Sequence, residues 1–327
     1  MTSVFVMAAG KGTRLAPWTT VVPKPALPVA NEPSLGFLLR LAARHGFRDV
    51  TANASWLSDV LLGIFGDGSA HGVNLAWNVE DSPLGTAGGV LAAQDRLRDG
   101  DEPIMVLSGD GLHDADLAGI ERSHRESGAI ATLALQPVAD PSEYGVAVVD
   151  GSNRVTSFQE KPARGTEQSN LANTGIYVFQ PEALDLCASW GLTDFGTELF
   201  PRLLAEGRHV QAHALVDTYW NDIGDLDEWR STNVALLDSQ IDAGPGAWND
   251  DGMDLDRVLV HPTAQLGDGV RLIGPCVIGA GARIGDGAVL RSAMVLPYAE
   301  LPAGLVVASG TTGSIDGLER WARELIG

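Results

Sequence analysis

The sequence has few cysteines and no long apolar run. Its two cysteines, Cys187 and Cys276, are isolated in 327 residues, so we expect free thiols and not a disulfide framework. No apolar run approaches the roughly 20 residues that a membrane-spanning helix needs. The apolar run near the N-terminus is short and has no basic residues before it, unlike a signal peptide. We therefore expect a cytoplasmic protein with no membrane partner.

Positive charge is also scarce. The chain has 22 Lys and Arg residues against 42 Asp and Glu residues, a formal net charge of −20. Nucleic acid or an anionic membrane would be repelled by such a chain, so we exclude both as partners. Only three of the basic residues are lysines: Lys11, Lys24 and Lys161. If the protein binds an anion, it must do so with a few placed cations.

Strand-like and helix-like segments alternate over most of the chain, and 45% apolar content is enough for a large core. Expected strands cover residues 4–9, 49–54, 73–77, 104–108, 130–138, 144–150, 155–160, 171–177 and 210–215. Expected helices cover residues 35–45, 57–65, 86–97, 117–127 and 226–237. This alternation predicts an α/β domain with a doubly wound, mostly parallel, Rossmann-like sheet over residues 1–240.

The first strand runs into a glycine-rich turn, Gly10 to Thr13, whose backbone N–H groups can cradle phosphate oxygens. It is not a Walker A loop, because no Lys-Ser or Lys-Thr pair follows its last glycine. It is not a dinucleotide fingerprint either, since Leu15 stands where the third glycine belongs. Arg14 adds a cation, and Lys24 adds another on a loop stiffened by prolines on both sides.

The opening stretch, G-x-G-T-R followed by P-K-P, resembles the signature of the sugar-1-phosphate nucleotidyltransferases. In that family the arginine and the lysine hold the triphosphate of an incoming NTP, which implies this role for Arg14 and Lys24. The resemblance also implies that the nucleotide is bound along the whole turn: Ala8, Ala9, Gly10, Lys11, Gly12 and Thr13. Ala9 departs from the glycine that many members carry.

A second glycine-rich loop, from Glu80 to Gly89, resembles the family segment E-x-x-P-x-G-T-A-G. In the family this loop closes on the base and ribose, which implies Glu80, Gly85 and Thr86 as nucleotide-binding residues. A threonine at the start of a helix can also simply cap it. Both interpretations of Thr86 stay open at this point.

Two further segments resemble the family's Y-G-V strand and its E-K-P and N-x-G-I-Y motifs. There the glutamate and the asparagine bind sugar hydroxyls and the lysine binds the sugar phosphate. This implies a sugar-phosphate site at Gly145, Glu160, Lys161 and Asn173. On its own, an adjacent Glu–Lys pair would be a surface ion pair of little consequence.

Two aspartates are candidates for a magnesium site. Asp110 directly follows the apolar strand 104–108, at the edge where parallel sheets bind ligands. Asp222 falls on the aspartate of the family pattern W-x-D-I-G, although in isolation it could cap helix 226–237. Two hard carboxylates that converge on one ion suit Mg²⁺ with bound phosphates. The resemblance therefore implies Mg²⁺ as the cofactor.

Beyond residue 240 the character of the sequence changes. Residues 241–256 are rich in glycine and acidic side chains and predict a linker. After Val260 an apolar residue recurs at every sixth position: Leu266, Leu272, Ile278, Ile284, Leu290 and Leu296. This hexapeptide repeat predicts a left-handed parallel β-helix of about two coils in domain 257–327. We expect an amphipathic helix over 315–326 to cap it, and the β-helix to join copies into a homo-oligomer.

The resemblance implies an enzyme whose substrates are an NTP and a sugar 1-phosphate and whose products are an NDP-sugar and pyrophosphate. The P-L-G-T-A-G loop favours GTP with mannose 1-phosphate or a related hexose 1-phosphate. Glucose-1-phosphate thymidylyltransferase is the alternative. A hexapeptide-repeat acyltransferase fits poorly, because His261 is the repeat region's only histidine. A non-catalytic regulatory homologue is disfavoured, because both aspartates and the motif lysines are present.

Overall fold

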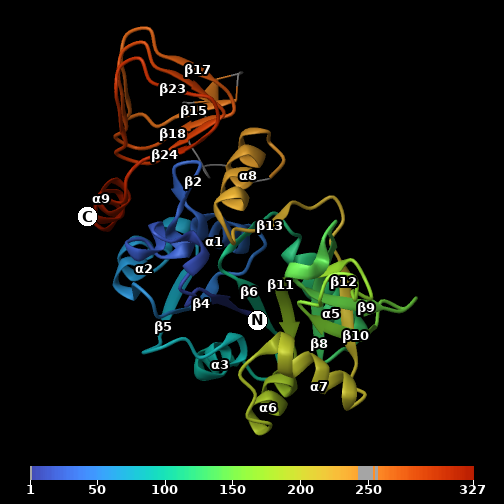
Figure 1. The fold of residues 1–327 in the computed structure, drawn as a ribbon. Coiled ribbons are helices and arrows are strands. Elements are labelled where there is room, and N and C mark those ends of the chain that lie inside the picture. Colours follow the sequence, from blue (N-terminus) through green and yellow to red (C-terminus); the bar gives the residue numbers. More distant parts are fainter. Residues whose placement is uncertain (1, 242–252, 255–256) are drawn as a thin grey trace.

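A nine-stranded sheet forms the centre of the first 240 residues in the computed structural model, which describes residues 2–241, 253–254 and 257–327 (Figure 1). Its strands are β1 (Ser3–Met7), β4 (Asp49–Ala54), β5 (Asn74–Val79), β6 (Ile104–Ser108), β8 (Ala131–Pro137), β9 (Gly145–Val149), β10 (Val155–Glu160), β11 (Leu171–Phe179) and β12 (Val210–Ala214). The main path runs β10-β9-β11-β6-β1-β4-β5, and β8 and β12 extend the sheet from β11.

The two halves of this sheet differ in direction. Strands β6, β1, β4 and β5 are parallel, with Phe5 opposite Val106 and Val4 opposite Val50. Strand β11 runs antiparallel to β6, β8 and β9. The predicted Rossmann-like α/β fold is confirmed, with the parallel arrangement concentrated in the N-terminal half.

Helices pack on both faces of the sheet, as the doubly wound pattern predicted. They are α1 (Ser34–Arg44), α2 (Ser58–Phe65), α3 (Thr86–Ala92), α4 (Gln94–Leu97), α5 (Leu117–Ser127), α6 (Pro181–Ser189), α7 (Phe200–Ala205) and α8 (Leu226–Leu237). Because side chains alternate along a strand, β1 sends Val4 and Val6 into one core and Phe5 into the other. The expected helix 86–97 is interrupted at Ala93, and α6 had no counterpart among the expected elements.

A short two-stranded sheet joins distant parts of the chain beside β6. Strand β7 (Gly111–His113) pairs with β13 (Trp220–Asp222), and Gly111 lies opposite Asp222. This pairing was not expected from the sequence. The pairing of β7 with β13 places Asp222 next to the end of β6 and next to Asp110.

The hexapeptide region forms three parallel sheets of short strands, consistent with the predicted left-handed β-helix (Figure 1). One sheet holds β15 (Val258–Val260), β18 (Cys276–Ile278), β21 (Ala293–Val295) and β24 (Gly310–Thr312), joined by β14 (Met253–Asp254). The second sheet holds β16 (Gln265–Leu266), β19 (Arg283–Ile284) and β22 (Glu300–Leu301). The third sheet holds β17 (Arg271–Ile273), β20 (Val289–Arg291) and β23 (Val306–Val307).

These strands make three coils, so the expectation of about two coils was wrong. The last coil was missed because the six-residue period slips by one residue after Leu290. It continues at Val295, Leu301 and Val307, which stack on Ile278, Ile284 and Leu290. Of the predicted repeat residues, Ile278, Ile284 and Leu290 are buried in the β-helix core. The expectation for Leu296 was wrong, because Val295 takes the inward place and Leu296 belongs to the core cluster of the larger domain. Leu266 is 44% exposed, because its strand lies at the edge of its sheet.

The C-terminal helix α9 (Ile315–Ile326) has the predicted bounds but a different neighbour. It packs against α2, where a Cβ on Gly63 would lie 2.8 Å from Ile326 (Figure 1). Its buried Leu318 and Trp321 belong to the same core cluster as the first half of the sheet. The helix therefore joins the β-helix to the larger domain, and the expectation that it caps the stack is corrected.

Several expectations fall outside what the structure describes. The predicted linker 241–256 lies almost wholly outside the described residues, and the domain boundaries and the cytoplasmic location stay predictions. Within the described residues, no helix has the length and apolar character needed to cross a membrane. Cys187 and Cys276 are both free and buried.

Candidate active site

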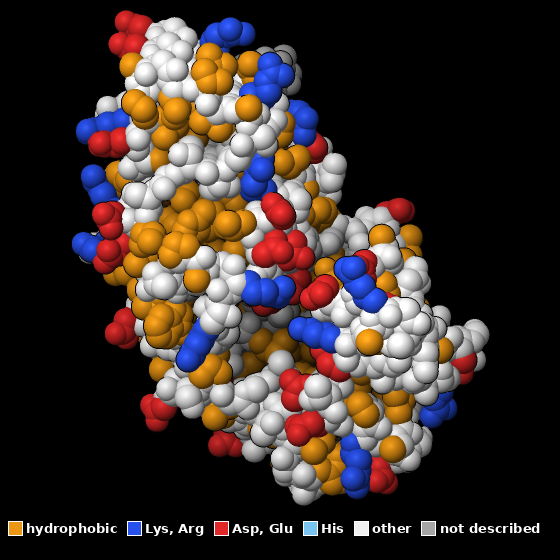
Figure 2. All heavy atoms as spheres, viewed as in Figure 1, with side chains coloured by type: hydrophobic (Ala, Val, Ile, Leu, Met, Phe, Trp, Pro, Cys, Tyr) orange, Lys and Arg blue, Asp and Glu red, His pale blue; other side chains and the backbone are white. Residues whose placement is uncertain are grey.

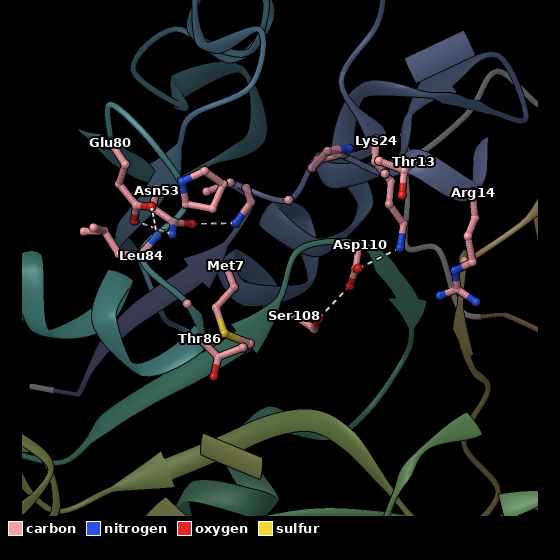
Figure 3. A pocket seen from close by; sticks show the side chains of 18 residues that line it. Met7, Thr13, Arg14, Lys24, Asn53, Glu80, Leu84, Thr86, Ser108 and Asp110 are labelled. Carbon is pink, nitrogen blue, oxygen red and sulfur yellow. Dashed lines mark hydrogen bonds and ion pairs between the residues drawn. The ribbon is translucent and has the colours of Figure 1, made fainter. Parts of the chain in front are cut away.

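A cavity of about 400 Å³ lies at the carboxyl ends of β1, β4, β5 and β6 (Figure 3). Figure 2 shows the hollow between the two halves of the larger domain, with acidic and basic side chains gathered around it. The cavity is lined by ten of the eleven residues predicted to bind the nucleotide: Ala8, Ala9, Gly10, Gly12, Thr13, Arg14, Lys24, Glu80, Gly85 and Thr86. Lys11 lies outside it, with its ammonium 5.9 Å from the centre of the Trp56 ring.

The first glycine-rich turn packs closely on the loop that carries Lys24. Gly12 has a φ of +62°, and a Cβ there would lie 2.9 Å from Cβ of Lys24. The hydroxyl of Thr19 donates to the carbonyl of Gly12 at 2.9 Å. Glycine is therefore required here both by the backbone conformation and by the close approach of Lys24.

Lys24 bridges the two predicted metal-binding carboxylates. Its Nζ lies 2.7 Å from Oδ2 of Asp110 and 3.1 Å from Oδ1 of Asp222, and the residue as a whole is only 8% exposed (Figure 3). The Ser108 hydroxyl donates to the other oxygen of Asp110 at 2.6 Å. The resemblance placed Lys24 on the triphosphate, whereas in the structure its ammonium lies between the two carboxylates.

The proximity of these charges shifts their pKa values. Burial disfavours the ammonium of Lys24, but the charges of Asp110 and Asp222 outweigh burial and raise its pKa above the ordinary 10.5. Burial likewise disfavours the Asp110 carboxylate, but Lys24 and Ser108 hold its pKa below the ordinary value. Burial and the like charge of Asp110 raise the pKa of Asp222. The pair therefore needs a cation to stay fully ionised.

The two carboxylates fit a divalent cation. They converge on one position already taken by a positive charge, and their side chains are 36% and 34% exposed, so the position can be reached. Among the described residues no group of three or more His, Cys, Asp or Glu side chains could hold a metal. A hard cation here would take its remaining oxygens from substrate phosphates and water, as Mg²⁺ commonly does.

The second glycine-rich loop is fastened to the segment before α7. The backbone N–H groups of Ala87 and Gly88 donate to the carbonyl of Thr193 at 2.9 and 3.2 Å. Gly85 has a φ of +86°, and a Cβ there would lie 2.4 Å from this same carbonyl oxygen. N–H groups at the start of α3 are thus already bonded within the protein. Glycine is needed at position 85 because a side chain there would collide with the Thr193 carbonyl.

Thr86 does not cap α3, because its hydroxyl makes no bond to the helix backbone. Instead it donates to Oδ2 of Asp194 at 3.0 Å and accepts from the N–H of Phe195 at 2.8 Å. The capping alternative is therefore wrong. Thr86 lines the cavity and links its loop to the segment that carries Asp194.

Glu80 and Asn53 form a buried bridge at the other end of the cavity (Figure 3). Nδ2 of Asn53 donates to Oε1 of Glu80 at 2.7 Å, and the N–H of Leu84 donates to Oε2 of Glu80 at 3.1 Å. Oδ1 of Asn53 accepts from the N–H of Ala8 at 2.6 Å. The two glycine-rich loops are therefore connected through side chains from β4 and the end of β5.

A second cavity, of about 210 Å³, adjoins the first and is lined by Gly145, Glu160, Lys161 and Asn173. The structure thus brings together all four residues predicted to bind the sugar phosphate. The two cavities share five lining residues: Met7, Arg14, Thr86, Ser108 and Asp110. Asp222 lines the second cavity beside them.

Local geometry directs the second cavity's polar groups. Lys161 has a φ of +43°, an uncommon conformation for a side chain of this size, and its N–H donates to the carbonyl of Tyr144 at 3.1 Å. Burial raises the pKa of Glu160. Nδ2 of Asn173 donates to the Tyr177 hydroxyl at 2.8 Å. The Lys161 backbone and the Asn173 side chain are therefore fixed by hydrogen bonds within the protein.

The motif comparison missed several residues of the two cavities. Tyr144 and Trp220 stack edge to face, with ring centres 5.3 Å apart, and line the second cavity with Asp194. Tyr144 and Trp220 are the aromatic residues of the Y-G-V and W-x-D-I-G patterns, so the motifs contained them although neither was predicted as a site residue. Asn53 is a polar residue in a buried strand, which is a weaker signal, and nothing in the sequence marks Asp194.

The chain was compared with protein families and with known proteins. The family model described as nucleotidyl transferase matches residues 3–239. A UTP–glucose-1-phosphate uridylyltransferase of Synechocystis is 35% identical, over 92% of this chain and 84% of its own length. A mannose-1-phosphate guanylyltransferase of Mycobacterium tuberculosis is 36% identical, over 92% of this chain and 82% of its own length.

A solved structure from Bacillus anthracis, described as a glucose-1-phosphate thymidylyltransferase in complex with a sucrose, is similar in fold. Its TM-score is 0.63 and its sequence identity is 23%, over 71% of this chain and 94% of that one. At this identity the likeness supports the fold alone. It agrees with the Rossmann-like sheet described above.

Proposed function

Because this chain belongs to the nucleotidyl transferase family, we propose that it transfers a nucleotidyl group from an NTP to a sugar 1-phosphate, forming an NDP-sugar and pyrophosphate. The proposal rests on one observation: the two cavities share lining residues. Arg14 and Asp110 line both, so a nucleotide in one and a sugar phosphate in the other would bring their phosphates to the same charged groups.

The reaction needs no protein nucleophile, because the sugar phosphate is already an anion. Its oxygen attacks the α-phosphorus of the NTP, the bond from that phosphorus to the β-phosphate oxygen breaks, and pyrophosphate leaves. The protein contributes position and charge. Arg14 and Lys24 hold the triphosphate, and Lys161 holds the sugar phosphate, with Glu160 and Asn173 beside the sugar hydroxyls.

We propose Mg²⁺ as the cofactor, held by Asp110 and Asp222. When bound, the ion supplies positive charge to the phosphates around the reacting phosphorus. The fit rests on the cation already present between the carboxylates, the Lys24 ammonium. A metal ion held by both carboxylates would take the place of the Lys24 ammonium, and the triphosphate would offer Lys24 another anionic partner.

For the base we propose guanine, because of the chemistry of Glu80. Its carboxylate already accepts from Asn53 and Leu84, but a carboxylate has about four acceptor sites, so it can accept further N–H groups from the cavity. Guanine offers N1–H and the 2-amino group side by side. Uracil and thymine offer a single N–H between two carbonyls. The favoured pair is GTP with mannose 1-phosphate or a related hexose 1-phosphate.

The alternatives are dTTP or UTP with glucose 1-phosphate. All can be tested by pyrophosphate release from five NTPs against a panel of sugar 1-phosphates, with Mg²⁺ and with EDTA. We expect release only when an NTP, a sugar 1-phosphate and Mg²⁺ are all present, and fastest release with GTP. A faster rate with dTTP or UTP would overturn the choice of base. Release from no pair would overturn the proposed function.

We also propose that the β-helix joins copies of the chain into a homo-oligomer. Leu266 and Val306 on its surface are 44% and 68% exposed, so both apolar side chains are available for contact with another copy. Light scattering during size-exclusion chromatography tests this. Replacing both residues with glutamate should yield a monomer, and a monomeric wild-type protein would overturn the proposal.

A further inference from the structure

Asn53 is the one member of the buried bridge that no motif identified. It lies on β4, at 3% exposure, between the two glycine-rich loops. It accepts from the N–H of Ala8 at 2.6 Å and donates to Glu80 at 2.7 Å. Glu80 in turn accepts from the N–H of Leu84. The bridge thus crosses the ends of three neighbouring strands, β1, β4 and β5.

The direction of each hydrogen bond in this bridge is fixed by chemistry. The N–H of Ala8 can only donate, so it selects the amide oxygen of Asn53 and turns the NH₂ group toward Glu80. The N–H of Leu84 can also only donate. Glu80 is therefore held as an acceptor from both sides. What it presents to the cavity is again an acceptor.

The bridge is also tightly covered on the side away from the cavity. Helix α3 lies so close that a Cβ on Gly89 would be 2.6 Å from Nδ2 of Asn53 and 2.9 Å from Oε1 of Glu80. Glu80 is only 5% exposed. Because α3 leaves no space for water on its side, the loss of one partner removes a hydrogen bond that only water entering from the cavity can replace.

We infer that Asn53 is a positioning residue that aims the Glu80 carboxylate at the nucleotide base and fixes the two glycine-rich loops relative to each other. It touches no reacting atom and acts through Ala8 and Glu80. This inference rests on the proposed function, since it assumes that the first cavity binds an NTP. Its expected signature is a change in nucleotide affinity and base preference without a matching loss of kcat.

The first test is Asn53→Ala, with Asn233→Ala as the matched control. Asn233 is equally buried, at 1% exposure, and also accepts from a backbone N–H, that of Ala30, and donates to a backbone carbonyl, that of Trp229. It lines neither cavity. We expect Asn53→Ala to weaken GTP binding by about tenfold or more in calorimetry and to change kcat by less than about threefold. Asn233→Ala should lose stability but keep its GTP affinity.

The second test moves the negative charge of the bridge from position 80 to position 53. Asn53→Asp alone places two carboxylates against each other and should bind GTP weakly. In the double variant Asn53→Asp, Glu80→Gln the bond between the two side chains can re-form in the opposite direction, because the amide that replaces the Glu80 carboxylate donates to the carboxylate that replaces the Asn53 amide. We expect NTP affinity to recover in the double variant. Base preference should move toward UTP or dTTP, because the cavity now meets an amide that can donate to a base carbonyl.

Four results would overturn the inference: unchanged GTP affinity in Asn53→Ala, an equal loss in Asn233→Ala, failure of Asn53→Ala to fold, or no recovery for any NTP in the double variant. If the double variant regains NTP affinity but still prefers GTP, Asn53 only fixes the two glycine-rich loops relative to each other. Its role in aiming Glu80 would then be overturned. Wild-type protein that binds no NTP would instead overturn the proposed function. The two failures are therefore distinguishable.

Discussion

The ammonium nitrogen of Lys24 lies 2.7 Å from Oδ2 of Asp110, although the two residues are 86 positions apart in the sequence. Asp222 completes the arrangement from the opposite side at 3.1 Å. A lysine thus forms an ion pair with each of the two carboxylates to which we assign a metal ion. Lysine and metal therefore compete for one position, and the triphosphate offers the lysine another partner.

The competition predicts that Lys24→Met binds metal more tightly than the wild-type chain when no nucleotide is present. The ammonium no longer has to be displaced, and a charge-assisted contact of ~1.5–3 kcal/mol corresponds to about tenfold or more in affinity. Binding of Mn²⁺ followed by electron paramagnetic resonance measures this directly. Lys11→Met is the matched control, because Lys11 lies on the glycine-rich turn that packs against the Lys24 loop but has its ammonium by Trp56, outside the cavity. Equal Mn²⁺ affinity in the wild type and Lys24→Met would contradict the competition.

Asp110→Asn should remove most of the activity and little of the stability. The amide keeps the shape of the carboxylate but not its charge, and we expect kcat to fall by roughly 10²–10³, the range seen when one placed electrostatic group is lost. Steady-state kinetics and a thermal unfolding curve together measure both effects. Asp225→Asn is the control, since Asp225 caps α8 beside the site and asparagine caps a helix equally well. A folded, fully active Asp110→Asn would refute the metal assignment.

Gly85→Ala should destabilise the protein and raise the KM for the NTP. The new Cβ would meet the carbonyl oxygen of Thr193 at 2.4 Å, and φ of +86° with ψ of 173° is a region open almost only to glycine, so we expect a cost of ~1–3 kcal/mol. Gly128→Ala is the matched control. Gly128 also has a positive φ, +61°, but nothing lies within 4 Å of its added Cβ, so ~1 kcal/mol is expected. Urea unfolding compares them, and an equal loss would mean that the Thr193 contact is unimportant.

Stability should fall with acidity partly through His124. This residue is fully buried, is bonded to Thr132 and Gln180, and burial lowers its pKa to about 4 from the ordinary 6.5. The contribution of neutral His124 to the free energy of unfolding is complete above pH 6.5, the pKa of the residue in the unfolded chain. This contribution is lost as the pH falls toward 4, its pKa in the folded protein. Between pH 7.5 and 5.0 it accounts for about 2 kcal/mol of lost unfolding free energy. Urea unfolding at the two pH values should show a smaller loss in His124→Asn. An unchanged loss would show that other groups carry the dependence.

The sequence was sufficient for features that depend on local order. The turn Gly10 to Thr13 and the carboxylate of Asp110 each follow directly after an apolar strand, so their place at the edge of the sheet could be predicted from the strands alone. The helix bounds of α5, α8 and α9 were predictable for the same reason, because capping residues and apolar spacing lie within the element.

The remaining features depend on contacts between distant segments. The Lys24 position, the bond from Thr86 to Asp194 and the Asn53 bridge each join segments that only the folded sheet brings together. The pairing of β7 with β13, which delivers Asp222, involves strands too short to leave an apolar pattern. The third coil of the β-helix was missed because its apolar residues, Val295, Leu301 and Val307, keep the six-residue spacing but start five residues after Leu290, and only stacking on the coil before reveals this register.

The proposed reaction makes one requirement that separates it from other uses of the same cavities: the α-phosphate of the NTP must become joined to the phosphate of the sugar. Incubation with mannose 1-phosphate, Mg²⁺ and GTP labelled with ³²P at either the α or the γ position tests this requirement. We predict that the α label appears in a sugar nucleotide and the γ label in pyrophosphate. Transfer of the γ label to the sugar phosphate, or no transfer of the α label from any of the five NTPs to any sugar 1-phosphate of the panel, would contradict the proposal.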